Sequence, residues 1–256
     1  MSRNMHKWEE LRPEEFLAEL RRAPVVYWAC GPMEDHGLQN ALGVDPCKAY
    51  EICLRAAALT GGVVFPLVPF APAGAPPLSR EQMRSGRYPL FPPSLFASVE
   101  LCRQIYLEIF ENMAELKFRV CVAFGGHGPA AGLLKSIVKE LGGKLNGMTI
   151  LPCSSVTFIG DLLRPPGGAD AGVHAGRHGG RWETSMNMAL NPEYVDLSRV
   201  RHIEHSPMPS QLKGLDEANL GDIENSSLEF GEKLLSTFAQ RLANEVRRIL
   251  GQNTPC

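Results

Sequence analysis

The sequence predicts an α/β fold, a single three-layer α/β/α domain built on a mostly parallel central sheet. Short apolar runs alternate with helical segments of ten residues or more, which is the pattern of a parallel sheet covered by helices. The chain has no internal repeat and no linker long enough to divide it, and 256 residues are enough for one large core. We therefore expect residues 1–256 to form one domain.

Four short apolar runs are predicted as buried strands. Each is rich in Val, Ile, Leu or aromatic residues and is bounded by polar residues, Gly or Pro. They lie at residues 25–28, 63–68, 119–124 and 148–152. In a parallel sheet, the loops after the carboxyl ends of the strands meet at one edge and form the ligand site. The loops after these runs are therefore where a site is expected.

Helices are predicted between and after these runs. The first begins near Pro13, because proline suits a first helical turn and the acidic residues after it favour the positive end of the helix dipole. A second opens at Asp45, whose carboxylate can cap it, and runs to Gly61. Apolar residues at helical spacing predict further helices over residues 94–116, 130–141 and 228–250.

Composition excludes several classes of protein. With 28 Asp and Glu against 26 Lys and Arg, the chain has no overall positive charge to bind nucleic acid or an anionic membrane. No apolar run approaches the roughly 20 residues that a membrane span needs. The 7 cysteines form no CxxC pair, which predicts buried thiols rather than a disulfide framework. We expect a soluble cytoplasmic protein whose partners include neither nucleic acid nor a membrane.

Three loops hold a large share of the side chains that can bind metal. The first reads Glu34-Asp35-His36 and has Asp45 nine residues after the histidine; the second is residues 125–128 and the third is residues 174–185. Carboxylate and imidazole without thiolate suit Zn, Mn or Fe in a hydrolytic site. In an extended segment, Glu34 and His36 point the same way, and Asp45 can offer its two oxygens to two ions. Two such ions can activate a bridging water and polarise a carbonyl.

Each loop also has a simpler interpretation. An aspartate before proline, such as Asp45, is more often a helix cap than a ligand. The loop at residues 34–36 could be a solvated turn, the glycines around His127 could form an anion-binding helix entry, and Glu183 could merely begin a helix. The prediction of a metal site therefore depends on the co-occurrence of all three loops.

Together, these motifs resemble the creatininase (creatinine amidohydrolase) family. Members of this family carry three motifs in order. The first is similar to Gly-Ser-x-Glu-Gln-His-Gly, with an Asp nine residues beyond the His. The second is similar to Asn-Gly-His-Gly-Gly-Asn and the third to His-Ala-Gly-x-x-Glu-Thr-Ser. The matching segments here are residues 31–37 with Asp45, residues 125–128 and residues 178–185, in the same order. The resemblance extends from about residue 24 to residue 190.

The resemblance implies a site with two divalent metal ions, Zn in the first place, with Mn or Fe as alternatives. The implied ligands are Glu34 and His127 on one ion, His36 and Glu183 on the other, and Asp45 between them. It assigns catalysis to His178, as the proton carrier, and to Glu183. His174-Ala175-Gly176 spells the family tripeptide literally, but aligning on His174 requires a four-residue insertion before Glu183, so we prefer His178 and keep His174 as an alternative.

The chain also departs from the family pattern. Pro129 stands two residues after the loop histidine, where creatininases have a further carboxylate ligand. Because proline has no ligand atom in its side chain, this position argues against creatinine as the substrate and leaves Glu183 as the source of the missing carboxylate. Near the third loop, Arg181 could bind an anionic group or be a surface charge, and Trp182 could stack on a substrate or lie in the core.

The sequence therefore predicts a metal-dependent amidohydrolase that cleaves an amide or formamide C–N bond of a small molecule with a metal-bridged hydroxide. The alternative is a metal-binding or assembly protein of the same fold that has lost catalysis. A phosphate-binding protein that uses residues 125–128 would leave the acidic and histidine residues unexplained. The resemblance also implies a homo-oligomer, a hexamer in this family.

Overall fold

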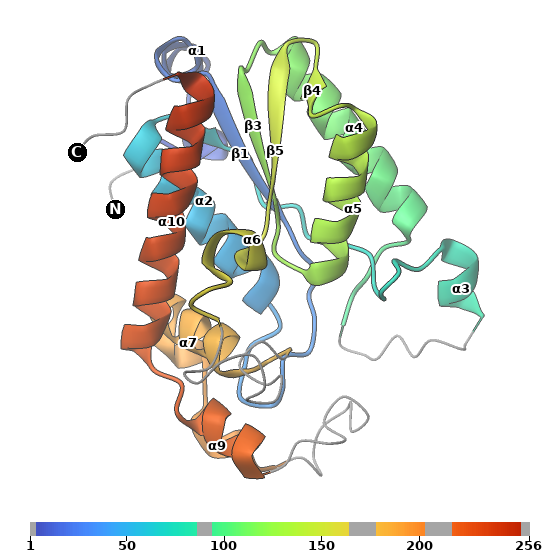
Figure 1. The fold of residues 1–256 in the computed structure, drawn as a ribbon, viewed down its shortest axis with the longest axis vertical. Coiled ribbons are helices and arrows are strands. Elements are labelled where there is room, and N and C mark those ends of the chain that lie inside the picture. Colours follow the sequence, from blue (N-terminus) through green and yellow to red (C-terminus); the bar gives the residue numbers. More distant parts are fainter. Residues whose placement is uncertain (1–3, 86–93, 164–177, 203–216, 252–256) are drawn as a thin grey trace.

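A five-stranded sheet lies at the centre of the protein (Figure 1). This computed structural model describes residues 4–85, 94–163, 178–202 and 217–251. The strand order is β2-β1-β3-β5-β4. The strands are β1 (Val25–Cys30), β2 (Val63–Val64), β3 (Val120–Gly125), β4 (Lys144–Leu145) and β5 (Met148–Cys153). All neighbours are parallel except β4, which runs antiparallel to β5 at the edge, so the predicted mostly parallel sheet is confirmed.

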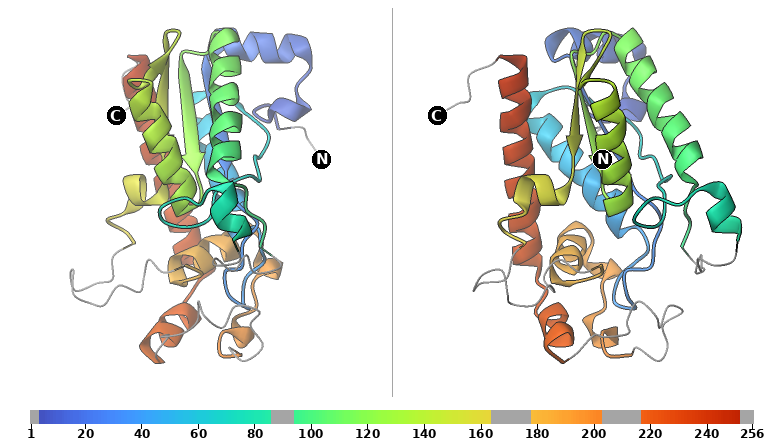
Figure 2. Two further views of the ribbon diagram at one scale, coloured as in Figure 1. Left: turned by 90° about the vertical axis from the view of Figure 1, so that its right-hand side faces the viewer. Right: turned by 45° about the vertical axis from the view of Figure 1, so that its right-hand side comes forward.

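Helices cover both faces of this sheet, as the right view of Figure 2 shows. The helices are α1 (Pro13–Arg22), α2 (Val44–Thr60), α3 (Arg80–Arg84), α4 (Val99–Glu115), α5 (Gly128–Glu140), α6 (Ser155–Ile159), α7 (Arg181–Leu190), α9 (Glu217–Glu224) and α10 (Leu228–Leu250), with short 3-10 turns at Trp8–Glu10, Pro192–Tyr194 and Leu197–Arg199. No helix in the described ranges is both long and apolar enough to cross a membrane.

The two faces of the sheet have separate cores. Alternate residues of β1 point to opposite sides: Tyr27 joins the core formed with α2, α7 and α10, and Trp28 joins the core formed with α4 and α5. All six residues of β1 and all six of β3 are buried. This is why these strands read as continuous apolar runs in the sequence rather than as alternating ones.

The structure corrects three predicted details. The helix predicted over residues 94–116 begins at Val99, because the Ser98 hydroxyl caps it by accepting a hydrogen bond from the Leu101 amide. The strand predicted over residues 63–68 is paired as a strand only at Val63–Val64, and Pro66 beyond it has no N–H to donate. Asp45 is not a helix cap: α2 starts one residue earlier, after Gly43, with no side-chain cap.

The carboxyl ends of β1 and β3 place two of the predicted loops side by side. The Gly126 amide, just after β3, donates a hydrogen bond of 2.8 Å to the carbonyl of Cys30 at the end of β1. A Cβ atom on Gly126 would lie only 2.3 Å from the carbonyl oxygen of Asp45, so only glycine lets this loop pack against the first turn of α2. This contact brings His127 next to Asp45.

Candidate metal centre

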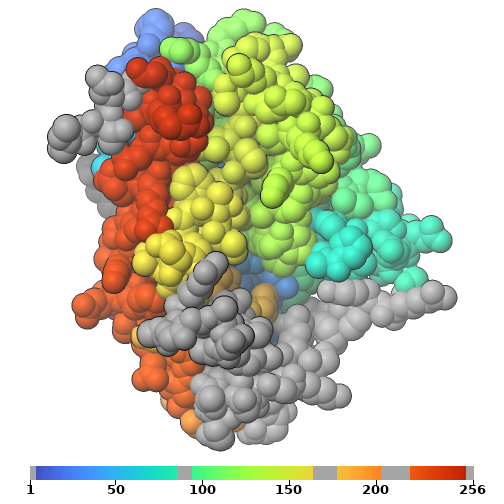
Figure 3. All heavy atoms as spheres, viewed as in Figure 1, coloured from blue at the N-terminus to red at the C-terminus, as the bar shows by residue number. Residues whose placement is uncertain are grey.

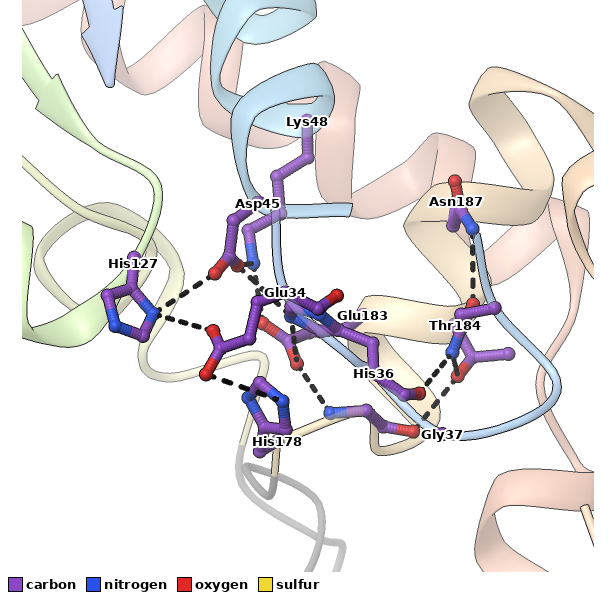
Figure 4. Close-up of polar contacts among 12 residues, drawn as sticks. Glu34, His36, Gly37, Asp45, Lys48, His127, His178, Glu183, Thr184 and Asn187 are labelled. Carbon is purple, nitrogen blue, oxygen red and sulfur yellow. Dashed lines mark hydrogen bonds and ion pairs between the residues drawn. The ribbon is translucent and has the colours of Figure 1, made fainter. Parts of the chain in front are cut away.

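Six side chains predicted to form the site gather at this edge of the sheet, and Figure 4 shows them pointing toward one another. They form three overlapping groups in which one ligand atom from each residue lies within 4.8 Å of the others. The groups are Glu34, Asp45 and His127; His36, Asp45 and Glu183; and Glu34, His36 and His178. The third loop is described only from residue 178 onward, so His174 lies outside the described residues.

The loop after β1 carries Glu34 and His36 and is held against α7 by amide side chains. Gln39 Nε2 donates to the carbonyl of Gly179 at 2.9 Å, and Asn40 Nδ2 donates to the Thr184 hydroxyl at 2.9 Å. Asn187 Nδ2 in turn donates to Asn40 Oδ1 at 3.1 Å. These bonds fix the position of the first loop relative to the third. No sequence motif indicated that Gln39 and Asn40 position the site.

The first group converges on one imidazole nitrogen. His127 Nδ1 lies 3.1 Å from Oε2 of Glu34 and 3.1 Å from Oδ2 of Asp45. Both carboxylates are buried, and Oε2 of Glu34 has no hydrogen-bond partner among the described residues. Two buried carboxylates beside a single imidazole form a set of oxygen and nitrogen donors that suits a divalent ion such as zinc.

The second group is built around a completely buried His36. Its Nδ1 lies 3.1 Å from the carbonyl oxygen of Glu34, which can only accept, so Nδ1 carries the proton. The other nitrogen, Nε2, has no hydrogen-bond partner in the described structure and lies 3.3 Å from Oδ1 of Asp45 and 3.6 Å from Oε2 of Glu183. A backbone acceptor on one imidazole nitrogen is a common way to orient the other toward a metal.

Lys48 is a member of this cluster that was not predicted from the sequence. Its ammonium is completely buried and donates to Oδ1 of Asp45 at 2.6 Å and to Oε1 of Glu183 at 2.5 Å. It also lies 4.7 Å from the ring centroid of Trp182. The sequence feature that could have indicated Lys48 is its position three residues after Asp45, a candidate ligand, because residues three apart on a helix share a face.

Charge interactions within the cluster shift several pKa values. Burial alone would lower the pKa of His36, but the carboxylates of Asp45 and Glu183 outweigh it and raise the pKa to about 9. Burial also acts to lower the pKa of His127, and the hydrogen bond to Asp45 reverses this and raises it to about 9. Burial acts to raise the pKa of both Asp45 and Glu183, but the nearby Lys48 ammonium holds each below its ordinary value. Both carboxylates are therefore ionised at neutral pH.

His178 lies at the more exposed side of the cluster. Its ring centroid is 4.1 Å from that of His36, and its Nε2 lies 3.9 Å from Oε1 of Glu34. The same nitrogen donates to the backbone carbonyl of Asp35, which leaves Nδ1 as the acceptor of a neutral ring. About a third of the side chain, 35%, is exposed, so solvent or a small molecule in the cavity can reach the ring.

Residues at the start of α7 combine structural and site contacts. Glu183 accepts the Gly179 amide at 2.8 Å, so it stabilises the helix start as well as facing His36. Trp182 is buried in the core beside α2 and α10, which matches the core interpretation. Arg181 pairs with Asp222 at 3.6 Å and packs over the ring of Phe230, so these contacts support a structural role rather than anion binding.

A cavity of about 420 Å³ opens onto the cluster. Its wall includes Asp45, His127, His178 and Glu183, together with Pro129 and the beginning of α6. Figure 3 shows α6 (yellow) between α10 (red) and α5 (yellow-green). The volume falls in the range of sites for small molecules, which is roughly 300–1,000 Å³.

The fold and the buried carboxylate–imidazole cluster define an α/β protein with a candidate metal centre at the carboxyl edge of its sheet. The chain belongs to the creatininase family: the family model for creatininase, described as creatinine amidohydrolase, matches residues 9–246. The chain is 25% identical over 258 residues to creatinine amidohydrolase of Pseudomonas putida, an alignment that covers 93% of this chain and 95% of that protein. The resemblance seen in the motifs is thereby confirmed.

Solved structures agree with the predicted fold. A crystal structure of creatininase matches with a TM-score of 0.72 at 23% identity, over 95% of this chain and 97% of that chain. A mutant creatininase described as Zn-Zn type matches with a TM-score of 0.70 at 22% identity, over 96% of this chain and 98% of that chain. At these identities the likeness shows the creatininase-like fold.

Proposed function

We propose that this protein is a metal-dependent amidohydrolase that hydrolyses an amide or formamide C–N bond of a small molecule. The observation that carries the proposal is the convergence of Glu34, Asp45 and His127, two of which, Asp45 and His127, line a cavity. One buried carboxylate oxygen of this group, Oε2 of Glu34, has no hydrogen-bond partner in the described structure. Membership of the creatininase family supports the hydrolase class. The cavity volume supports a small-molecule substrate.

The proposed resident group is a divalent ion held by Glu34, Asp45 and His127. Zinc is the first candidate, supported by the Zn-Zn type relative, and Mn and Fe also suit such ligands. When bound, the ion supplies a Lewis acid that polarises a carbonyl and lowers the pKa of water. The donors expected for a second ion, His36, Asp45 and Glu183, also lie together, but both carboxylates already bind Lys48.

The remaining steps fall to side chains and backbone of this chain. His178 would take a proton at Nδ1 from the water that attacks the carbonyl and return it to the leaving nitrogen, because its Nε2 is already bound to the Asp35 carbonyl. Helix α5 begins at Gly128 in the cavity wall, and the positive end of its dipole favours negative charge on the substrate carbonyl oxygen. Pro129 lies in the same wall and offers no carboxylate, which supports a substrate other than creatinine.

A second candidate function is metal binding without catalysis, in a binding or assembly protein. The observation that favours it is the buried pairing of Lys48 with two predicted ligands. In that case the cluster would bind an ion tightly but would not hydrolyse a substrate. A homo-oligomer, a cytoplasmic location and a single domain over residues 1–256 remain predictions, and light scattering of the purified protein tests the first.

Metal depletion followed by reconstitution tests the proposed function. The chain is stripped with a chelator, reloaded separately with Zn, Mn or Fe, and assayed against a panel of amides and formamides for release of amine and acid. Hydrolysis that disappears with the metal and returns with it supports the amidohydrolase. Tight metal binding without turnover of any member supports the second candidate, and hydrolysis unaffected by stripping contradicts both.

A further inference from the structure

Lys48 places a fixed positive charge inside the cluster. No other lysine or arginine side chain in the described ranges is buried. The ammonium binds one oxygen of Asp45 and one of Glu183, and these are the two carboxylates of the second candidate metal group. In Figure 4 the Lys48 side chain descends from α2 toward this group.

We propose that the Lys48 ammonium takes the place of a second divalent ion, so that the centre of this protein holds one metal ion per chain. The proposal rests on the proposed function in one respect, since it takes Glu34, Asp45 and His127 as the site of that one ion. It differs from the two-ion site that the family resemblance implies.

The two oxygens of Asp45 separate the two cations. Oδ2 faces His127 and is available to the metal, whereas Oδ1 accepts the Lys48 hydrogen bond at 2.6 Å. A metal bound by Oδ1 at the usual distance of about 2.0–2.2 Å would share that oxygen with the ammonium and repel it at short range. Displacing the ammonium is also costly, because it is completely buried and lies over the Trp182 ring at 4.7 Å.

The charge of the cluster points the same way. The carboxylates of Glu34, Asp45 and Glu183 with the ammonium of Lys48 leave two negative charges when the imidazoles are neutral, and one divalent ion neutralises them. A second divalent ion would leave two uncompensated positive charges in a buried site. The neighbouring Asp35 belongs to none of these groups, and its Oδ1 accepts the Gly37 amide at 2.8 Å.

The metal content of the purified full-length chain tests this inference. Protein is equilibrated with excess Zn²⁺, desalted and analysed by plasma mass spectrometry against a protein concentration from amino-acid analysis. We expect one zinc per chain for the wild type, one for Lys48→Arg, which keeps the cation, and two for Lys48→Met, which removes it. Two zinc ions in the wild type, or one in folded Lys48→Met, would overturn the inference. A wild type that binds no metal would instead contradict the proposed function.

The unpartnered Nε2 of His36 is the observation that would favour a second ion, so His36 is tested directly. We expect His36→Gln to leave the zinc content of the wild type at one and to reduce that of Lys48→Met from two to one. A drop below one in the single variant would identify His36 as a ligand of the resident ion and overturn the assignment.

Cobalt substitution keeps the inference testable if Lys48→Met fails to fold. We expect wild-type protein loaded with excess Co²⁺ to give the electron paramagnetic resonance signal of isolated high-spin cobalt. A spin-coupled pair of cobalt ions in the wild type would overturn the one-ion centre.

Discussion

Lys48 donates a hydrogen bond of 2.6 Å to Oδ1 of Asp45 less than one turn earlier on α2, and both side chains are completely buried. The same ammonium reaches Glu183 on α7, 135 positions later in the chain. One lysine thereby ties the start of α2 to the start of α7 and neutralises charge at the place where a metal centre is proposed. Burial of three charges in one contact makes the pairing costly to break.

Removing this ammonium should destabilise the metal-free protein. Lys48→Ala leaves two buried carboxylates without their counter-ion, and the expected loss is about 3–5 kcal/mol in the free energy of unfolding. Urea unfolding after chelator treatment measures it. The control is Lys135→Ala on the exposed face of α5, where the change should stay within about 0.5 kcal/mol. Equal stability of the two variants would contradict a structural role for the Lys48 ion pairs.

Asp45→Asn should weaken metal binding more than any other single change in the cluster. Asp45 belongs to both of the candidate metal groups that contain two carboxylates. The asparagine amide keeps the shape of the aspartate side chain but not its negative charge. We expect at least a 100-fold loss of zinc affinity, since mutation of a residue that only orients a metal ligand already lowers metal affinity by about 10–100-fold. Competition with a chromophoric chelator measures it. Asp161→Asn is the control because Asp161 lies at the surface in a pair with Arg241. Unchanged zinc affinity in Asp45→Asn would show that Asp45 is not a metal ligand.

Zinc affinity should rise with pH up to about 9. The pKa of His127 is raised from 6.5 to about 9 in the metal-free protein, where burial opposes the shift and the hydrogen bond to Asp45 outweighs burial. At pH 7 a proton therefore competes with the metal for Nδ1, and this competition ends once the pH exceeds the raised pKa. Zinc titrations in competition with a chelator between pH 6 and 10 measure the slope, and His127→Gln should flatten it. A flat profile in the wild type would show that His127 is not a ligand.

The same shift links the stability of the metal-free protein to pH. A group whose pKa is higher in the folded state stabilises that state fully below its unfolded value, here 6.5, and loses this contribution as the pH rises through about 9. We therefore expect the Tm of chelator-treated protein to fall between pH 6.5 and 9, and this fall to be smaller when both His36 and His127 are replaced by Gln. Differential scanning calorimetry checks the sign, and a Tm that increases over this window would refute the assignment.

His178→Gln should lower turnover without removing the metal. The side chain belongs to the cavity wall and is the more exposed imidazole of the cluster, so its loss removes a proton carrier and leaves Glu34, Asp45 and His127 in place. General acid–base catalysis contributes about 10²–10⁴-fold, which sets the expected fall in kcat on the substrate that the panel identifies. His6→Gln, away from the cavity, is the control. If His178→Gln keeps the kcat of the wild type, a group other than His178 transfers the proton.

Much of the architecture follows from the sequence. The apolar runs at residues 25–28 and 119–124 predicted the two central strands, because strands buried on both faces need no polar alternation. The spacing from Glu34 to Asp45, with the loop at His127, indicated which side chains could meet, since loops after parallel strands share one edge of the sheet.

Tertiary packing decided the rest. Asp45 before a proline looked like a helix cap, yet α2 begins one residue earlier and the carboxylate turns to His127 and Lys48. The partnership of Lys48 with Glu183 depends on the packing of α2 against α7, and no local pattern encodes a contact between residues 135 positions apart. Periodicity and motif spacing report which residues can share a face or an edge. The packing of the helices on the sheet decides which charged groups lie within hydrogen-bonding distance of each other. A buried ionised group is stable only beside such a partner, because leaving water without one costs free energy.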